Sequence, residues 1–76
     1  MESKSNLDVA TLKEGTEFRY DEHLYYVVGK CYDNEYDTTL IIARYLSKNE
    51  KWWEYDIFVA DWFKILVKKG LITESE

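Results

Sequence analysis

The chain has 76 residues, of which 33% are charged and 17% are aromatic, and its formal net charge at pH 7 is −5. This length corresponds to one domain, which buries only about 60% of its unfolded surface and depends on a compact apolar core. Cys31 is the only cysteine in the sequence, which excludes an intrachain disulfide. The acidic balance argues against a phosphate-tracking groove, so we expect no direct binding of nucleic acid.

The two ends of the sequence are polar. Residues 1–6 lack the apolar segment of a signal peptide, and no run approaches the roughly 20 apolar residues of a membrane span. We therefore expect a cytoplasmic protein with a reduced thiol and no membrane contact. Residues 1–6 and 73–76 are expected to be disordered tails of a single domain, and residues 7–15 are expected to form a short turn or irregular segment.

Three strands joined by two turns are predicted next. Residues 16–20 alternate apolar and polar side chains, which is typical of a half-buried strand with Phe18 on its inner face. Residues 24–46 contain two runs of β-branched and aromatic residues around a centre rich in Asp, Asn and Glu, which predicts a hairpin. Gly29 interrupts the first run and indicates a bulge or bend.

Residues 51–57 predict a fourth strand, because the alternation of side chains resumes after the turn-forming residues 47–50. One face of this strand is expected to lie in the core and the other in solvent. The side chains expected in the core are those of Trp53, Tyr55 and Ile57. Those expected in solvent are Trp52, Glu54 and Asp56.

From about residue 57 the apolar spacing becomes that of a helix. Its apolar face would hold Phe58, Val59, Trp62, Phe63 and Leu66. Asp56 is a candidate N-cap, and Asp61 is the alternative cap if the strand continues through Val59. Gly70 fits the position that follows the helix, with Leu71 or Ile72 folding back onto it.

These elements predict an α+β fold, with a small, bent antiparallel sheet of about four strands covered by one C-terminal helix. A partly open SH3-like barrel is one form that such a bent sheet can take. A domain this small needs a lid over its sheet, because a hairpin alone is marginally stable in water. We therefore expect the helix to be that lid, with the Trp62 ring buried beneath it.

Residues 33–37 place acidic side chains at the first, third and fifth positions of a segment, as an EF-hand calcium loop does. The loop pattern then fails, because Thr38 stands where glycine is needed and Arg44 stands where the bidentate glutamate is needed. A solvated hairpin turn is the better interpretation, and we expect no metal or other cofactor.

The sequence contains no clear catalytic group. His23 follows Asp21 and Glu22, but adjacent turn residues point apart and no nucleophile is paired with them. Cys31, on a predicted strand, is typical of a small buried hydrophobe rather than a reactive thiol. We therefore do not expect an enzyme, although a fold that gathered His23, Cys31 and a carboxylate in one pocket would favour one.

The function expected from these features is that of a small, acidic, non-enzymatic protein-interaction module. It would act as an adaptor or inhibitor by occupying a surface on a larger protein through exposed aromatics and carboxylates. The residues expected to bind the partner are Trp52, Glu54, Asp56, Tyr36, Asp33, Glu35 and Asp37. The partner and the oligomeric state are not specified by the sequence.

A nucleic-acid mimic that blocks a DNA- or RNA-binding protein is the alternative. Residues 17–37 contain six acidic residues against one arginine and one lysine, which concentrates negative charge in one part of the chain. The two functions respond differently to salt, because screening weakens a charge-based contact far more than an aromatic one.

Overall fold

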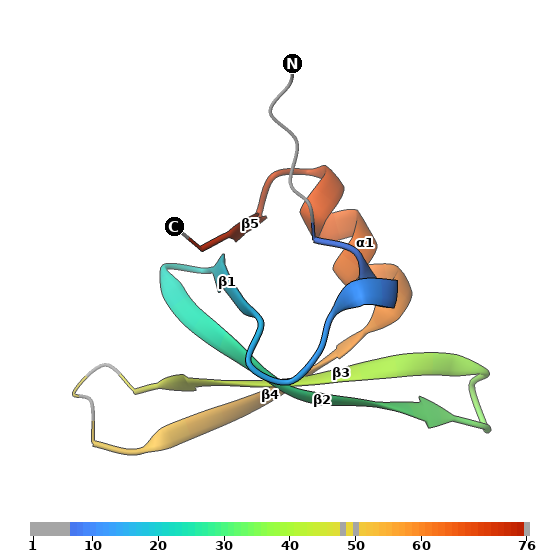
Figure 1. Cartoon of the computed structure of the whole chain (residues 1–76), viewed down its shortest axis with the longest axis horizontal. Helices are drawn as coiled ribbons and strands as arrows, with labels where there is room; N and C mark the ends of the chain where they lie inside the picture. Colours follow the sequence, from blue (N-terminus) through green and yellow to red (C-terminus); the bar gives the residue numbers. More distant parts are fainter. Residues whose placement is uncertain (1–6, 48, 50, 76) are drawn as a thin grey trace.

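The computed structural model describes residues 7–47, 49 and 51–75, and these form an open antiparallel sheet of five strands with one α-helix (Figure 1). The order of strands across the sheet is β4-β3-β2-β1-β5. In chain order the elements are the 3-10 helix η1 (Val9–Thr11), β1 (Glu17–Tyr20), β2 (His23–Asp33), β3 (Thr38–Leu46), β4 (Trp53–Val59), α1 (Ala60–Lys68) and β5 (Ile72–Glu74). The predicted α+β class, the bent antiparallel sheet and the C-terminal helix are confirmed.

The two predicted hairpins both form, and each has its own turn chemistry. β1 and β2 are joined by Asp21 and Glu22, whose φ angles of 53° and 66° are the positive values that a two-residue type I′ turn requires. Neither residue is the Asn or Gly that usually signals this turn. β2 and β3 are joined by residues 34–37, and the Asp33 carboxylate accepts a hydrogen bond from the Glu35 N–H.

The bulge predicted at Gly29 is present. The register between β2 and β3 shifts between Val27 and Gly29, so Val28 has no partner residue on β3. The first four residues of β2 pair with β1, and from Tyr26 onward the strand pairs with β3. This arrangement lets the sheet bend, with β1, β5, η1 and α1 on one side of the layer formed by β2, β3 and β4 (Figure 1).

The core lies between α1 and the side of the sheet that α1 covers. Phe18 is at its centre, stacked on Tyr25 with ring centroids 5.1 Å apart. The rings of Phe58 and Phe63 meet the Phe18 ring edge-on, at 5.7 and 5.3 Å. The buried residues that form the core are Leu12, Phe18, Tyr25, Val27, Ile41, Ala43, Phe58, Phe63, Leu66 and Ile72.

Helix α1 begins three residues later than it would with Asp56 as its cap, because β4 continues through Val59. Val59 occupies the N-cap position without a side-chain hydrogen bond. Asp61 lies in the first turn, where its negative charge interacts favourably with the positive end of the helix dipole. The candidate caps Asp56 and Asp61 are therefore both wrong.

The helix covers the core with Ala60, Phe63 and Leu66, which are buried. Trp62 is 53% exposed, so the prediction of a buried Trp62 is wrong. Successive residues of a helix are about 100° apart, and the helix that places Phe63 in the core therefore turns Trp62 outward. Sequence spacing alone could not choose between these neighbours, because both are aromatic.

The end of the helix agrees with the prediction. Gly70 has a φ of 81°, its N–H donates to the Val67 carbonyl at 3.0 Å, and the Leu71 N–H donates to the Leu66 carbonyl at 2.9 Å. These two bonds form a Schellman motif that reverses the chain. Ile72 is then buried and β5 pairs with β1. Thr73 and Glu74, predicted to be in a disordered tail, are thus strand residues, whereas the tail predicted at residues 1–6 is outside the described part of the chain.

Candidate functional site

The orientation of β4 is the opposite of the predicted one. Phe58 is buried in the core, and the Asp56 carboxylate accepts a hydrogen bond at 2.7 Å from the hydroxyl of the buried Tyr25. Side chains alternate along a strand, so Trp53, Tyr55 and Ile57 point to the side of the sheet away from α1. The prediction that these three face the core is wrong, because Phe58, the true core residue of β4, was assigned to the helix.

We call the side of β2, β3 and β4 that faces away from α1 the outer face. Across it, Tyr26 lies opposite Arg44, and Arg44 lies opposite Tyr55. Leu46 lies opposite Trp53, and Ile42 lies opposite Ile57. The residues of the outer face used below are Tyr26, Ile42, Arg44, Leu46, Trp53, Tyr55, Ile57 and Val59.

Large side chains on the outer face are well exposed and partly held in place. Tyr55 and Ile57 have 57% and 64% of their surface exposed. The Arg44 guanidinium carbon lies 4.1 Å from the centroid of the Trp53 ring, a cation–π contact. The Tyr26 ring meets the Trp53 ring edge-on, with centroids 5.7 Å apart. A contiguous exposed patch of aromatic and aliphatic side chains is typical of a surface that binds another molecule.

The segment that precedes β1 borders the outer face. The Gly15 N–H donates to the Val27 carbonyl at 2.9 Å, which holds this segment beside β2. A shallow hollow of about 240 Å³ lies at this border. Its lining residues are Glu14, Gly15, Tyr26, Val27, Val28 and Arg44. Tyr26 and Arg44 therefore belong both to the aromatic patch and to a concave border.

Acidic side chains lie on the other side of β4. Glu54 and Asp56 are both exposed, and the Trp52 indole N–H donates to the Glu54 carboxylate. The pKa of Tyr25 is raised above its usual range by burial, and further by its hydrogen bond to Asp56 and the charge of that carboxylate. The pKa of Tyr45 is raised by burial and by the negative charges of Asp56, Glu54 and Asp21. The tyrosine hydroxyls here are thus kept protonated beside a concentrated negative charge.

The residues predicted to bind a partner fall into two separate groups. Asp33, Glu35, Tyr36 and Asp37 lie at the turn between β2 and β3, whereas Trp52 precedes β4 at the other end of the sheet (Figure 1). Trp52 is 53% exposed, as predicted, but the reason given for it is wrong, because Trp53 does not point into the core. The structure does not bring the two groups together as one site.

The outer-face residues Tyr26, Arg44, Tyr55 and Ile57 were missed as a group. The signal that could have found them is the presence of large apolar side chains on both faces of β2 and β3, which exceeds what one helix can cover.

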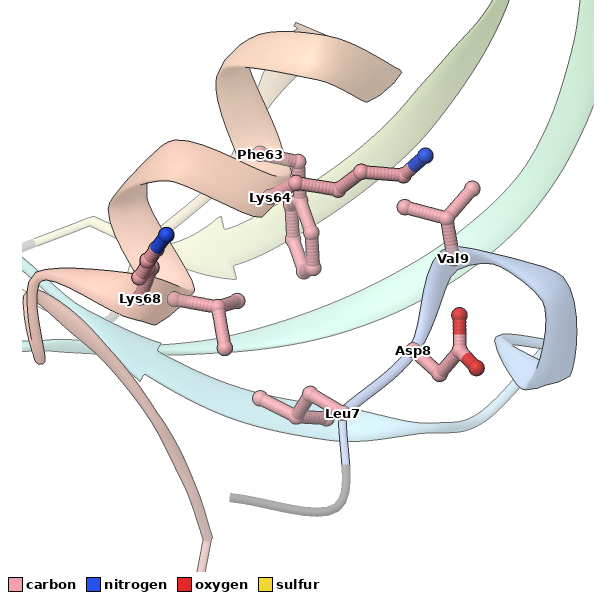
Figure 2. A pocket seen from close by; sticks show the side chains of 7 residues that line it. Leu7, Asp8, Val9, Phe63, Lys64 and Lys68 are labelled. Carbon is pink, nitrogen blue, oxygen red and sulfur yellow. The ribbon is translucent and has the colours of Figure 1, made fainter. Parts of the chain in front are cut away.

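A second hollow lies between η1 and α1 (Figure 2). Leu7, Val9 and Phe63 provide apolar walls, and Lys64 and Lys68 extend from the helix beside them. Its volume is about 180 Å³, and both hollows are below the roughly 300 Å³ at which ligand pockets usually begin. The outer face is the better candidate because of its exposed apolar side chains, such as Tyr55 and Ile57, and not because of the size of its hollow.

His23 and Cys31 are not brought together. The His23 ring lies against the Tyr45 ring, with centroids 4.2 Å apart, on the side of the sheet that carries the core. Cys31 lies towards the other end of β2 and is exposed, so the prediction of a buried Cys31 is wrong. Among the described residues, no group of three His, Cys, Asp or Glu side chains could hold a metal ion. No helix in the described part of the chain has the length and apolar character needed to cross a membrane.

Comparison with known proteins identifies no relative. No protein-family model matches the sequence, and neither the curated proteins nor the solved structures that were searched contain a match.

Proposed function

We propose that this protein is a non-enzymatic interaction module, an adaptor or inhibitor, that binds a larger protein through the outer face of its sheet. The observation that carries the proposal is the exposure of Tyr55 and Ile57 beside the cation–π pair of Arg44 and Trp53. Trp, Tyr and Arg are the residue types that most often dominate binding energy at protein interfaces. The cytoplasmic location expected from the sequence remains part of this proposal.

Side chains of the outer face already contact one another before a partner binds. A fully buried Ile or aromatic side chain contributes roughly 1.5–3 kcal/mol relative to an exposed one. The Trp53 ring contacts both Arg44 and Tyr26, so less conformational freedom is lost when a partner covers it. The partner surface would carry apolar side chains that match Tyr55 and Ile57, and acceptors that can reach Arg44.

The test compares capture of partner proteins by immobilised full-length variants. The variant Tyr55→Ser/Ile57→Ser changes the outer face, and the control Trp62→Ser/Leu71→Ser changes two side chains of similar exposure elsewhere. We expect the wild type and the control to retain the same partner, and the outer-face variant to retain it at least about tenfold less. Equal retention by all three proteins would contradict the proposal.

A nucleic-acid mimic is the second candidate. It is supported by the negative charge that Asp21, Glu54 and Asp56 place around Tyr45. Binding by a mimic should weaken steeply as salt rises from low to physiological concentration, whereas binding through Tyr55 and Ile57 should change little. A steep salt dependence with no effect of the outer-face substitutions would favour the mimic.

A further inference from the structure

Strand β4 is an edge of the sheet. It stands at the end of the strand order, and the described elements in contact with its backbone are β3 and α1. Its seven residues pair with β3 in continuous register, without the shift seen in β2. Natural sheets usually protect such an edge with charged side chains, especially lysine, or with proline or a bulge, and β4 contains no lysine, proline or bulge. The only charged residues in β4 are Glu54 and Asp56.

From this edge we infer that β4 accepts an extended segment of the partner protein as an additional strand, in which basic residues alternate with apolar ones. The inference rests on the proposed function and specifies the partner's chemistry. Pairing of backbone groups along an exposed edge supplies affinity in such complexes, and the alternate side chains supply specificity.

The two faces of β4 determine the alternation. A residue paired with Glu54 or Asp56 projects to the same side as these carboxylates, where a lysine or arginine is favoured. Asp56 accepts one hydrogen bond from Tyr25, and a carboxylate has capacity for further donors. A residue paired with Trp53, Tyr55 or Ile57 projects to the outer face, where an aromatic or β-branched side chain is favoured.

The added strand would also enlarge the outer face. Tyr26, Arg44 and Tyr55 form a row across β2, β3 and β4, and an apolar residue opposite Tyr55 would continue this row. The edge and the outer face would thus contact one partner as a continuous surface. Affinity would come from the backbone and from the same aromatic side chains that the proposed function uses.

Charge argues against a second copy of this chain as the occupant. The antiparallel register that pairs all seven residues of β4 with those of another β4 places Asp56 directly opposite Asp56 of the second copy. Like charges directly opposite are destabilising, and each chain carries a net charge of −5. A basic strand removes this repulsion, so a partner with lysine or arginine at alternate positions fits the edge better.

The experiment titrates the full-length, isotope-labelled protein with capped ten-residue peptides and follows amide signals by NMR. The first peptide alternates lysine with valine and tyrosine. The second has the same composition with its lysines in one block, and the third replaces every lysine with glutamate. The fourth repeats the first with every backbone nitrogen methylated, so it keeps the side chains but has no backbone donors.

We expect the first peptide to bind and to slow amide exchange in β4, and the other three to bind at least tenfold more weakly. Glu54→Lys should weaken the first peptide at least tenfold and improve binding of the third. Glu35→Lys makes the same charge change at the turn between β2 and β3 and should leave both peptides unchanged.

Three results would overturn the inference. The first is that the block peptide or the N-methylated peptide binds as tightly as the first peptide. The second is that amide protection appears outside β4, and the third is that β4 amides become protected with rising protein concentration in the absence of peptide, which would identify a second copy as the occupant. If partner capture depends on Tyr55 and Ile57 while methylation has no effect, the strand pairing fails and the interaction role stands. If capture is insensitive to both residues but the first peptide binds as expected, the outer-face role fails instead.

Discussion

The two faces of β4 differ in a way that their composition does not suggest. The face with more apolar residues, which carries Trp53, Tyr55 and Ile57, is in solvent, whereas the face with Glu54 and Asp56 meets the core at Phe58. Burial in this small domain is decided by where α1 can cover the sheet. Phe58, near the end of β4, fixes this face against the core together with the Tyr25–Asp56 hydrogen bond, because its ring contacts those of Phe18 and Phe63.

The largest expected effect tests the covered side. Phe63→Ala removes a fully buried ring and should lower the free energy of unfolding by about 3–5 kcal/mol, measured by urea denaturation. The matched control is Trp62→Ala, which removes a neighbouring aromatic side chain that is 53% exposed and should cost less than about 1 kcal/mol. A larger loss for Trp62→Ala than for Phe63→Ala would show that the helix is rotated from the orientation described above.

An intermediate effect is expected where the core meets the acidic side of β4. Tyr25→Phe removes the hydroxyl that donates to Asp56 and should cost about 1.5 kcal/mol at neutral pH. The pKa of Tyr25 is raised in the folded protein, so its contribution is complete below the usual tyrosine pKa of 10.0 and is lost as the pH rises above it.

Unfolding free energies of the wild type, measured between about pH 8 and about pH 11, should therefore fall at the alkaline end. The fall should be less steep in Tyr25→Phe, because the substituted ring cannot ionise. Parallel curves for the two proteins would exclude Tyr25 as the group that causes the alkaline loss.

The smallest effect is expected on the outer face. Ile57→Ala should change the free energy of unfolding by about 0.5 kcal/mol or less, since most of the side chain is already in solvent. Ile41→Ala, at a fully buried position on the neighbouring strand, should cost about 2–5 kcal/mol and serves as the control. Similar thermal midpoints for the two variants would remove the distinction between the faces.

Strands β1 to β4, the main hairpin and the helix end could be predicted because they depend on local chemistry, whereas β5 was missed. β-branched and aromatic runs favour extended backbone, residues 34–37 favour a turn, and Gly70 tolerates a φ of 81°. The bulge beside Gly29 was predicted on the same local grounds. These features need information only from residues close in sequence.

The composition of the candidate site was decided by contacts between residues distant in sequence. Because both faces of β4 carry apolar side chains, the sequence is compatible with either face packing on the core. In the same way, either Trp62 or Phe63 could be the helix residue that points into the core. The orientation is decided by Phe18, Tyr25 and Phe63, whose rings pack against Phe58, so that Trp53 lies on the outer face. One helix covers one side of a sheet, so only the packed structure determines which aromatic residues remain free to meet a partner.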